Sequence, residues 1–219
     1  ELAQVNAELK HLAVHDPLTE LPNRTLFNDR LEQLIQLAKR ENREFAVASI
    51  DLSKFKQIND TYGHDAGDAV LLEVGRRFSA ALRSTDTLAR MGGDEFAAIL
   101  SSHNIADNTA DVVAQLTESL RDPITLSDKT QIVAAANIGV AVYPRHAQSA
   151  EMLFKNADIA MYQAKRNKRG YAMFDQKKNM EEKEHLQLMT ELEQAITNEH
   201  LELHYQPILD LKTGRIISL

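Results

Sequence analysis

One stretch decides how the chain folds: Arg90-Met91-Gly92-Gly93-Asp94-Glu95-Phe96. Short apolar runs flank it at residues 87–89 and 96–100, a pattern that predicts two β-strands joined in a hairpin. Gly92 and Gly93 carry no Cβ, so a phosphate-bearing ligand can approach their backbone closely. Asp94 and Glu95, as neighbours on a strand, would point to opposite faces, which lets one carboxylate hold a metal while the other acts elsewhere. By itself the motif also fits an ordinary hairpin with solvated acids.

A second acidic strand end precedes the hairpin in the chain. Residues 45–52 form a nearly continuous apolar run that ends in a carboxylate, Asp51, and this predicts a buried central strand. A polar segment, S-K-F-K-Q-I-N-D-T-Y-G-H-D-A-G-D, follows at residues 53–68. An antiparallel sheet can place the end of such a strand beside the hairpin tip, so we expect Asp51 to lie near Asp94.

Together these two stretches resemble the GGDEF family, the diguanylate cyclases. The hairpin matches the family signature letter for letter, and residues 51–68 follow its D-x-D-x-F-K-x-x-N-D…G-H-x-x-G-D pattern. Ser53 departs from the pattern, because the family usually has a second Asp there. The resemblance covers residues 15–174 and implies an α+β fold, a ferredoxin-like or palm-type antiparallel sheet flanked by helices, which we expect on one face.

The resemblance also implies a guanine-binding segment. In the family, the positions of Asn59 and Asp68 hydrogen-bond the base of GTP, and a carboxylate can accept from two guanine N–H groups together. Phe55 and Lys56 belong to the same expected substrate-binding segment. The alternative for Asp68 is simple helix capping.

A helix is expected over residues 65–83, directly after this segment. Gly67 and Asp68 are expected in its first turn, where free N–H groups favour anions.

Phosphate contacts are implied further along the chain. Residues 158–169, D-I-A-M-Y-Q-A-K-R-N-K-R, end a predicted helix over 150–167 and are similar to the family's D-x-A-x-Y-x-A-K-x-x-G-R. The family's Lys and Arg contact the triphosphate, which implies this role for Lys165 and Arg169. Lys168 replaces the glycine of the pattern. A basic helix end otherwise only complements the helix dipole.

Two carboxylates and one carbonyl would make an oxygen-only metal site. The resemblance implies Asp51, Asp94 and the carbonyl of Leu52 as ligands of Mg²⁺ or Mn²⁺. Such a metal can lower the pKa of a ribose 3′-hydroxyl and bridge the triphosphate. The implied reaction condenses two GTP into cyclic di-GMP and pyrophosphate, with each half of a homodimer presenting one GTP. Asp94, Glu95, Gly92 and Gly93 are the expected catalytic residues, and Glu95 would support either the attacking hydroxyl or the metals.

Product feedback is implied by the run Arg83-Ser84-Thr85-Asp86. This R-x-x-D, at its distance before the hairpin, matches the family's inhibitory site, in which Arg83 and Asp86 would bind guanine edges of cyclic di-GMP. The plain alternative is a surface ion pair.

The flanks predict three segments. Residues 1–14 read as a helix with Leu2, Val5, Leu9 and Leu12 on one side, which either packs on its own domain or pairs with a second chain as a signalling helix. Residues 15–175 are the expected GGDEF domain. Residues 176–219 are expected to be a linker helix and the incomplete start of an EAL domain, the cyclic di-GMP phosphodiesterase often fused behind GGDEF, because L-x-L-x-Y-Q-P-I resembles its opening. We expect the chain to be a piece of a larger protein.

Composition limits the remaining possibilities. The chain has 219 residues, of which 43% are hydrophobic, and no apolar run reaches the roughly 20 residues that span a bilayer, so we expect no membrane contact in this piece. Zero cysteines exclude disulfides and thiolate metal sites and suit the cytoplasm, although missing upstream segments could anchor the parent protein. The net charge of -7 argues against a nucleic-acid polymer as partner.

Two functions stay open at this stage. The first is an active, feedback-inhibited cyclase. The second is a catalytically weak GTP-binding domain that controls a fused EAL phosphodiesterase, an interpretation motivated by the expected fusion and by Ser53. A generic metal-dependent cyclase or polymerase palm is a distant third. We also expect residues 131–142, apolar on both faces, to form one long strand.

Overall fold

The computed structural model describes residues 11–101, 105–198, 200, 202 and 204–218. The apolar seam predicted at Leu2, Val5 and Leu9 lies outside these residues, whereas residues 11–14 are helical. The chain divides into two compact units, Glu1–Asp175 and Gln176–Leu219.

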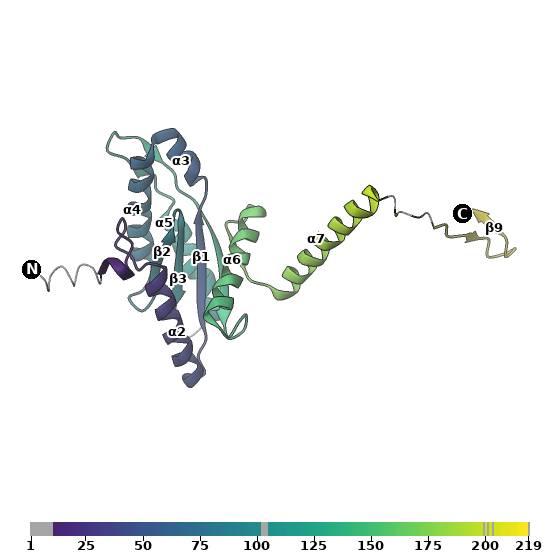
Figure 1. Cartoon of the computed structure of the whole chain (residues 1–219), viewed down its shortest axis with the longest axis horizontal. Helices are drawn as coiled ribbons and strands as arrows, with labels where there is room; N and C mark the ends of the chain where they lie inside the picture. The colour runs from purple at the N-terminus through teal and green to yellow at the C-terminus, as the bar shows by residue number, and fades with distance from the viewer. Residues whose placement is uncertain (1–10, 102–104, 199, 201, 203, 219) are drawn as a thin grey trace, which may run out of the picture. The chain divides into compact units, whose positions relative to one another are not determined.

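A five-stranded sheet organises the first unit, in the order β2-β3-β1-β6-β7 (Figure 1). Its members are β2 (Thr87–Gly92), β3 (Glu95–Leu100), β1 (Phe45–Leu52), β6 (Ala136–Tyr143) and β7 (Tyr171–Met173). The first four strands pair antiparallel, and β7 runs parallel to β6. Every residue of the central strand β1 is buried. The predicted α+β class with a mainly antiparallel sheet is confirmed.

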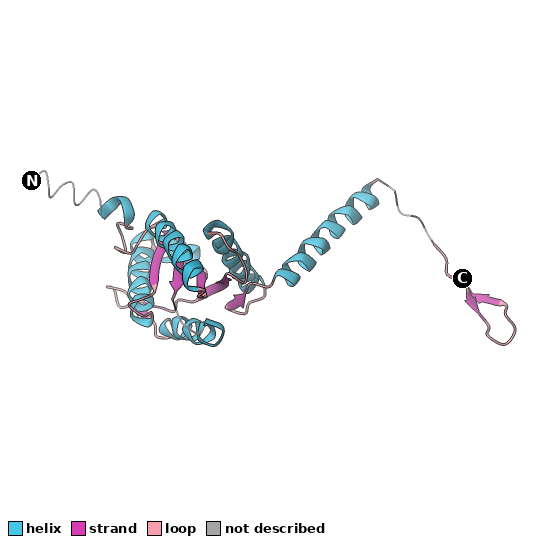
Figure 2. Ribbon diagram, turned by 90° about the horizontal axis from the view of Figure 1, so that it is seen from below, coloured by secondary structure: helices cyan, strands magenta, loops and turns pink. Residues whose placement is uncertain are grey.

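Helices cover both faces of this sheet, so the expectation of helices on one face was wrong (Figure 2). On one face α4 (His64–Ala81) packs its Phe78 edge-on against Phe96 of β3, with ring centroids 5.8 Å apart. On the other, α6 (Ala150–Arg166) accepts a hydrogen bond at Asp158 from Ser49 of β1. Because both faces of β1 are apolar, both need a covering layer.

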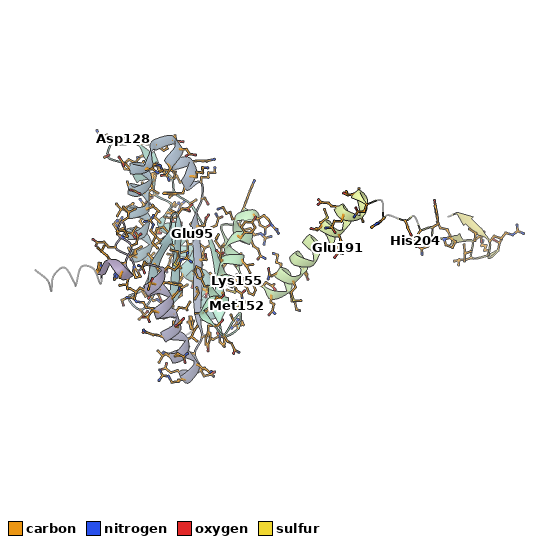
Figure 3. The ribbon with its side chains drawn as sticks, in the orientation of Figure 1. Glu95, Asp128, Met152, Lys155, Glu191 and His204 are labelled. Atoms are coloured by element: carbon orange, nitrogen blue, oxygen red, sulfur yellow. The ribbon has the colours of Figure 1, made fainter. Side chains whose placement is uncertain are left out.

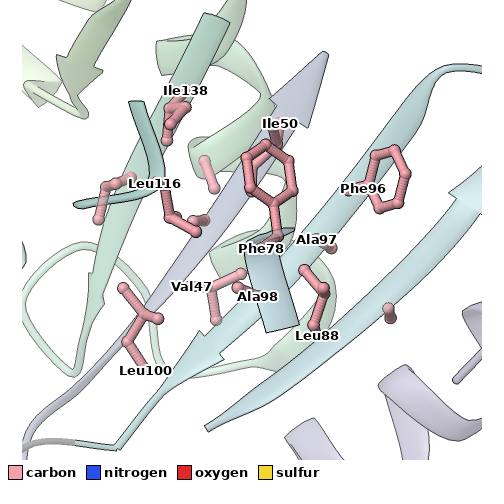
Figure 4. Packing of buried hydrophobic residues seen from close by; sticks show 14 of the residues in the cluster. Val47, Ile50, Phe78, Leu88, Phe96, Ala97, Ala98, Leu100, Leu116 and Ile138 are labelled. Carbon is pink, nitrogen blue, oxygen red and sulfur yellow. The ribbon is translucent and has the colours of Figure 1, made fainter. Parts of the chain in front are cut away.

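Further helices complete the two layers. The helix α2 (Arg24–Glu41) joins α6 through an edge-on contact of Phe27 with Phe154. The helix α5 (Ile105–Ser119) lies beside α4 and reaches β1 and β6. Figure 4 shows Phe78 of α4 and Leu116 of α5 in the same apolar cluster as Ile50.

A glycine lets α6 approach the sheet. A Cβ built on Gly139 of β6 would lie 1.9 Å from the Met161 nitrogen and 2.2 Å from the Ala157 oxygen of α6. The helix backbone therefore rests directly on the strand at this point. This close approach fixes how α6 lies along the sheet.

The expected long strand at residues 131–142 was wrong. The structure has β5 (Gln131–Ile132), which pairs with β4 (Ile124–Thr125), and then β6, which starts at Ala136 and pairs with β1. Between them the Ala135 carbonyl accepts a hydrogen bond from Ser53 N at 2.7 Å. The chain changes sheets here, which alternating apolar residues do not reveal.

The remaining described elements are short or belong to the second unit. A helix that the sequence did not predict, α3 (Phe55–Tyr62), directly precedes α4. The second unit contains α7 (Gln176–Thr197) and the antiparallel pair β8 (Ile208–Leu209) and β9 (Ile216–Ser218). Within the described part of the chain, no helix is both long and apolar enough to span a membrane.

Candidate active site

The hairpin tip is a two-residue turn at Gly93 and Asp94. Gly92 pairs with Glu95 across the turn, and a register shift follows Arg90. The φ angles of Gly92 and Gly93 are 132° and 55°, a region that strains any residue with a Cβ. Because Gly92 pairs with Glu95, Asp94 lies in the turn and only Glu95 lies on the strand. The expectation that both acids are neighbours on a strand was wrong.

The end of β1 lies beside this tip, as the antiparallel interpretation predicted. Leu52 N donates to the Asp94 carbonyl at 3.2 Å, and Asp51 is register-paired with Glu95. Paired residues in adjacent strands project to the same face. Glu95 is thus the direct neighbour of Asp51, while Asp94 adjoins it from the turn.

A lysine from α6 reaches this strand end. Lys165 Nζ donates to Asp51 Oδ2 at 2.8 Å, and the Asp51 side chain is only 10% exposed whereas that of Lys165 is 51% exposed. This hydrogen bond raises the pKa of Lys165. The sequence predicted both residues for the site but not their contact. Arg169, the other predicted phosphate ligand, is exposed just beyond the helix.

Three other acidic side chains act on Glu95, whose position is labelled in Figure 3. Burial raises the pKa of Glu95, and the charges of Asp158, Asp94 and Asp51 raise it further, against the opposing effect of Arg24. The Arg24 guanidinium lies 3.9 Å from the Glu95 carboxylate. Sequence reasoning missed Arg24, the first residue of α2, as a site residue.

These oxygen donors fit a divalent cation. A bound cation would relieve the repulsion that raises the pKa of Glu95, and carboxylates with carbonyls suit Mg²⁺ or Mn²⁺. Within the described residues, no group of three or more His, Cys, Asp or Glu side chains is arranged to hold a metal. Backbone carbonyl, water and ligand oxygens would therefore have to complete the shell.

An arginine clamp fixes the conformation of the turn. Arg90 donates from Nε and Nη2 to the Gly93 carbonyl at 3.1 and 2.8 Å, and from Nη1 to both oxygens of Asp16 at 3.0 and 3.1 Å. Burial would raise the pKa of Asp16, but hydrogen bonds from Thr19 and Arg90 outweigh it and hold the pKa below its ordinary value. The clamp ties residues 16–19 to the turn that carries Asp94.

The predicted base-binding residues gather at the α3–α4 junction. Asn59 Oδ1 is buried and has no hydrogen-bond partner in the described part of the chain. A Cβ on Gly67 would lie 1.9 Å from that oxygen, so α4 passes Asn59 closely at a glycine. Phe55 is buried beside them, and Lys56 and Asp68 are exposed. A donor brought by a ligand could satisfy Asn59 after a small side-chain movement.

One detail of this junction corrects the sequence-based expectation. The helix α4 begins at His64 with Gly63 as its N-cap, and Gly67 N already donates to the Gly63 carbonyl at 3.3 Å. Gly67 therefore has no free N–H group for an anion. An open groove of about 920 Å³ on another side of α4 is lined by Leu21, Ala69 and Leu72 among others, and its lining includes neither Asn59 nor Asp68.

The predicted feedback residues lie at the turn before β2. Asp86 accepts from Arg83 N at 3.1 Å through one oxygen and from Ser101 N at 2.9 Å through the other. Asp86 thus shapes the turn with its own carboxylate. The Arg83 side chain is exposed and accessible to a ligand.

Comparison with known proteins gives one family. The family described as "Diguanylate cyclase, GGDEF domain" matches residues 13–171. The bifunctional diguanylate cyclase/cyclic di-GMP phosphodiesterase MucR of Pseudomonas aeruginosa is 44% identical over the whole chain, which covers 32% of MucR. The cyclic di-GMP phosphodiesterase NbdA of the same organism is 38% identical over the whole chain, which covers 28% of NbdA. The chain thus spans about a third of the length of these curated relatives.

Solved structures agree with this assignment. The crystal structure of the GGDEF domain of TpbB from Pseudomonas aeruginosa superposes with a TM-score of 0.70 at 39% identity, covering 72% of this chain and 98% of that one. The coiled coil and GGDEF domain of DgcB from Caulobacter crescentus, in complex with c-di-GMP, gives a TM-score of 0.72 at 26% identity, covering 78% and 91%.

Proposed function

The chain belongs to the GGDEF family of diguanylate cyclase domains, and from this premise we propose that it condenses two GTP molecules into cyclic di-GMP with release of pyrophosphate. One observation carries the proposal: the register of β1, β3 and the hairpin turn brings Asp51, Asp94 and Glu95 to one sheet end, where Lys165 binds Asp51. This arrangement suits transfer of a nucleotidyl group.

In this proposal the guanine base lies at the α3–α4 junction. Asn59 and Asp68 would hydrogen-bond its edge. The Asn59 oxygen is buried and has no partner among the described residues, which supports a ligand there. Phe55 and Lys56 would line the same end. Lys165 and Arg169 would hold the triphosphate as cations. The base and the phosphates would then span the distance from α4 to the hairpin.

The chemistry needs a divalent cation, which we propose to be Mg²⁺ or Mn²⁺ held by Asp51, Asp94 and the Leu52 carbonyl. When bound, the cation activates a ribose 3′-hydroxyl and stabilises charge on the triphosphate. The protein positions that hydroxyl near Glu95, whose raised pKa suits a group that takes up a proton. Gly92 and Gly93 have no side chains, so a phosphate can lie against their backbone.

Each chain presents one GTP in this reaction, so we propose a homodimer as the active form. We further propose that Arg83, beside Asp86, binds cyclic di-GMP in feedback inhibition. The DgcB structure in complex with c-di-GMP supports product binding within the family. Residues 176–219 would be the linker helix and incomplete start of an EAL domain, which the bifunctional name of MucR supports.

A second candidate is a GTP-binding domain that regulates a fused phosphodiesterase. Ser53 favours it, because the residue lacks the usual carboxylate and its hydroxyl instead accepts a hydrogen bond from Asn137 at 2.9 Å. NbdA, similar over the whole chain, is named a phosphodiesterase alone.

Turnover separates the two candidates. We expect the chain, incubated with GTP and Mg²⁺, to form cyclic di-GMP at a rate that rises faster than linearly with protein concentration, because two chains must meet. Product is followed by chromatography, and GTP binding by calorimetry. Tight GTP binding without product would support the regulatory domain, provided that fusing a dimerising helix to the N-terminus does not restore turnover.

Weakening the Arg90 clamp on the turn is expected to reduce the catalytic rate moderately. Arg90→Lys keeps the charge but loses the planar fork that bonds Gly93 and Asp16 together, so we expect kcat to fall about tenfold while GTP affinity changes less than twofold. Steady-state kinetics and GTP titration measure the two effects. Arg40→Lys, at an exposed position on α2, is the matched control and should leave both values unchanged. An equal loss of affinity and kcat would show that Arg90 does more than position the turn.

A further inference from the structure

Two histidines lie one helical turn apart where the described chain begins. His11 and His15 are four residues apart, and His15 N donates to the His11 carbonyl at 2.9 Å, as in a helix. Their rings are stacked, with centroids 3.9 Å apart and planes inclined by 12°. His11 is exposed and His15 is half-buried. Neither residue takes part in the proposed reaction.

The hydrogen bond of the His15 ring fixes which nitrogen is available. His15 Nδ1 lies 3.1 Å from the His11 carbonyl oxygen. A carbonyl only accepts, so Nδ1 carries the proton and, in the neutral ring, Nε2 carries the lone pair. Histidines that bind metals commonly donate their other ring N–H to a backbone carbonyl in this way, which holds the ring in place.

We propose that His11 and His15 form a binding site for a transition-metal ion such as Ni²⁺, Cu²⁺ or Zn²⁺. Two histidines at i and i+4 on one helix face can bind one ion together. Ligand nitrogens around a tetrahedral ion lie about 3.3 Å apart, given bonds of about 2.0–2.1 Å, and the ion lies in the plane of each ring. The two rings are stacked with planes inclined by only 12°, so the exposed His11 would have to turn out of the stack to share an ion with His15, whose ring hydrogen bond stays in place. Imidazole suits these ions and not Mg²⁺, which prefers oxygen ligands.

The site is an open one. The described residues offer no third His, Cys, Asp or Glu to complete a group of three, so water or a ligand from elsewhere would fill the remaining positions. It also lies next to the turn clamp, because His15 precedes Asp16, whose carboxylate binds Arg90. A bound ion would tie the last helical turn to the segment that leads into this clamp. Asn23 holds the same segment, donating to the carbonyls of Val14 and Ala13.

Titration with Ni²⁺ alone, on the untagged chain, tests the proposal. We expect calorimetry to show a Ni²⁺ site that weakens at least tenfold in both His11→Gln and His15→Gln, while any Ni²⁺ held by the active-site carboxylates is unaffected. The His11 variant keeps the ring hydrogen bond of His15, so its effect reports the lost ligand and not a disturbed turn. His200→Gln removes a histidine from the second unit and should bind Ni²⁺ as the unchanged chain does.

A second measurement does not depend on calorimetric fits. Ni²⁺ should raise the melting temperature of the unchanged chain and of His200→Gln by more than it raises that of the two site variants, because an ion that binds only the folded state stabilises it. Melting without metal checks that both variants fold. Undiminished Ni²⁺ affinity in folded His11→Gln and His15→Gln would overturn the proposal, and so would an equal metal-induced shift in all variants.

Discussion

Gly139→Ala is expected to lower the free energy of unfolding by at least about 3 kcal/mol, the upper part of the range for overpacked cores. The new methyl group would overlap backbone atoms of α6, at 1.9 Å from Met161 N, 2.2 Å from Ala157 O and 2.5 Å from Met161 Cα. Backbone atoms cannot rotate away as a side chain can. The helix would have to move off the sheet, which would also shift Lys165 away from Asp51. Urea denaturation followed by circular dichroism measures the loss.

Gly75→Ala is the matched control. Gly75 is a buried glycine inside α4, but its Cβ would lie 3.3 Å from Leu21 Cδ1, the end of a flexible side chain. Alanine also favours a helix over glycine by about 1 kcal/mol, so we expect this variant to unfold within about 1 kcal/mol of the unchanged chain. An equal decrease in the free energy of unfolding of both variants would contradict the close packing of α6 on Gly139.

Local sequence patterns predicted the secondary structure that residues close together in the sequence determine. The apolar run of residues 45–52 became the buried strand β1, and the paired glycines became the hairpin between β2 and β3. Antiparallel pairing then brought the two acidic ends together, as expected. The break at Ala135 escaped prediction because β5 pairs with β4 whereas β6 pairs with β1, which lies far away in the sequence.

In the candidate site too, sequence patterns indicated the residues but not the contacts between distant ones. Motif spacing indicated Asp51, Asp94 and Lys165, but not that Lys165 would bind Asp51, because 114 residues separate them and the contact depends on how α6 lies along β6. The close packing of α6 on Gly139 decides how α6 lies along β6, and no periodic pattern in the sequence predicts this packing. The clamp of Arg90 on Asp16 was missed for the same reason, with 74 residues between the partners.

Asp94→Asn is expected to reduce the formation of cyclic di-GMP at least about 100-fold, the order of magnitude for losing one preorganised charge contact in a transition state. The amide has the shape of the carboxylate but neither its charge nor its affinity for a hard cation. The Leu52 hydrogen bond uses the backbone carbonyl of Asp94, which the substitution leaves in place, so we expect an unchanged melting temperature. Asp111→Asn, the same change at an exposed position on α5, should retain full activity.

The register gives this experiment a second use, because Glu95 and not Asp94 is paired with Asp51 across the strands. Measuring Mn²⁺ binding by paramagnetic resonance in Asp94→Asn and Glu95→Gln therefore tells the two carboxylates apart. If the turn carboxylate is the metal ligand, Asp94→Asn weakens Mn²⁺ binding at least about tenfold, a difference of about 1.4 kcal/mol, and Glu95→Gln weakens it less. The reverse order would make Glu95 the ligand. Asp94 lies in the turn that Arg90 holds through the Gly93 carbonyl. The distance between the carboxylates of Asp94 and Asp51 therefore depends on the conformation of this turn, whereas the distance between Glu95 and Asp51 depends on strand register.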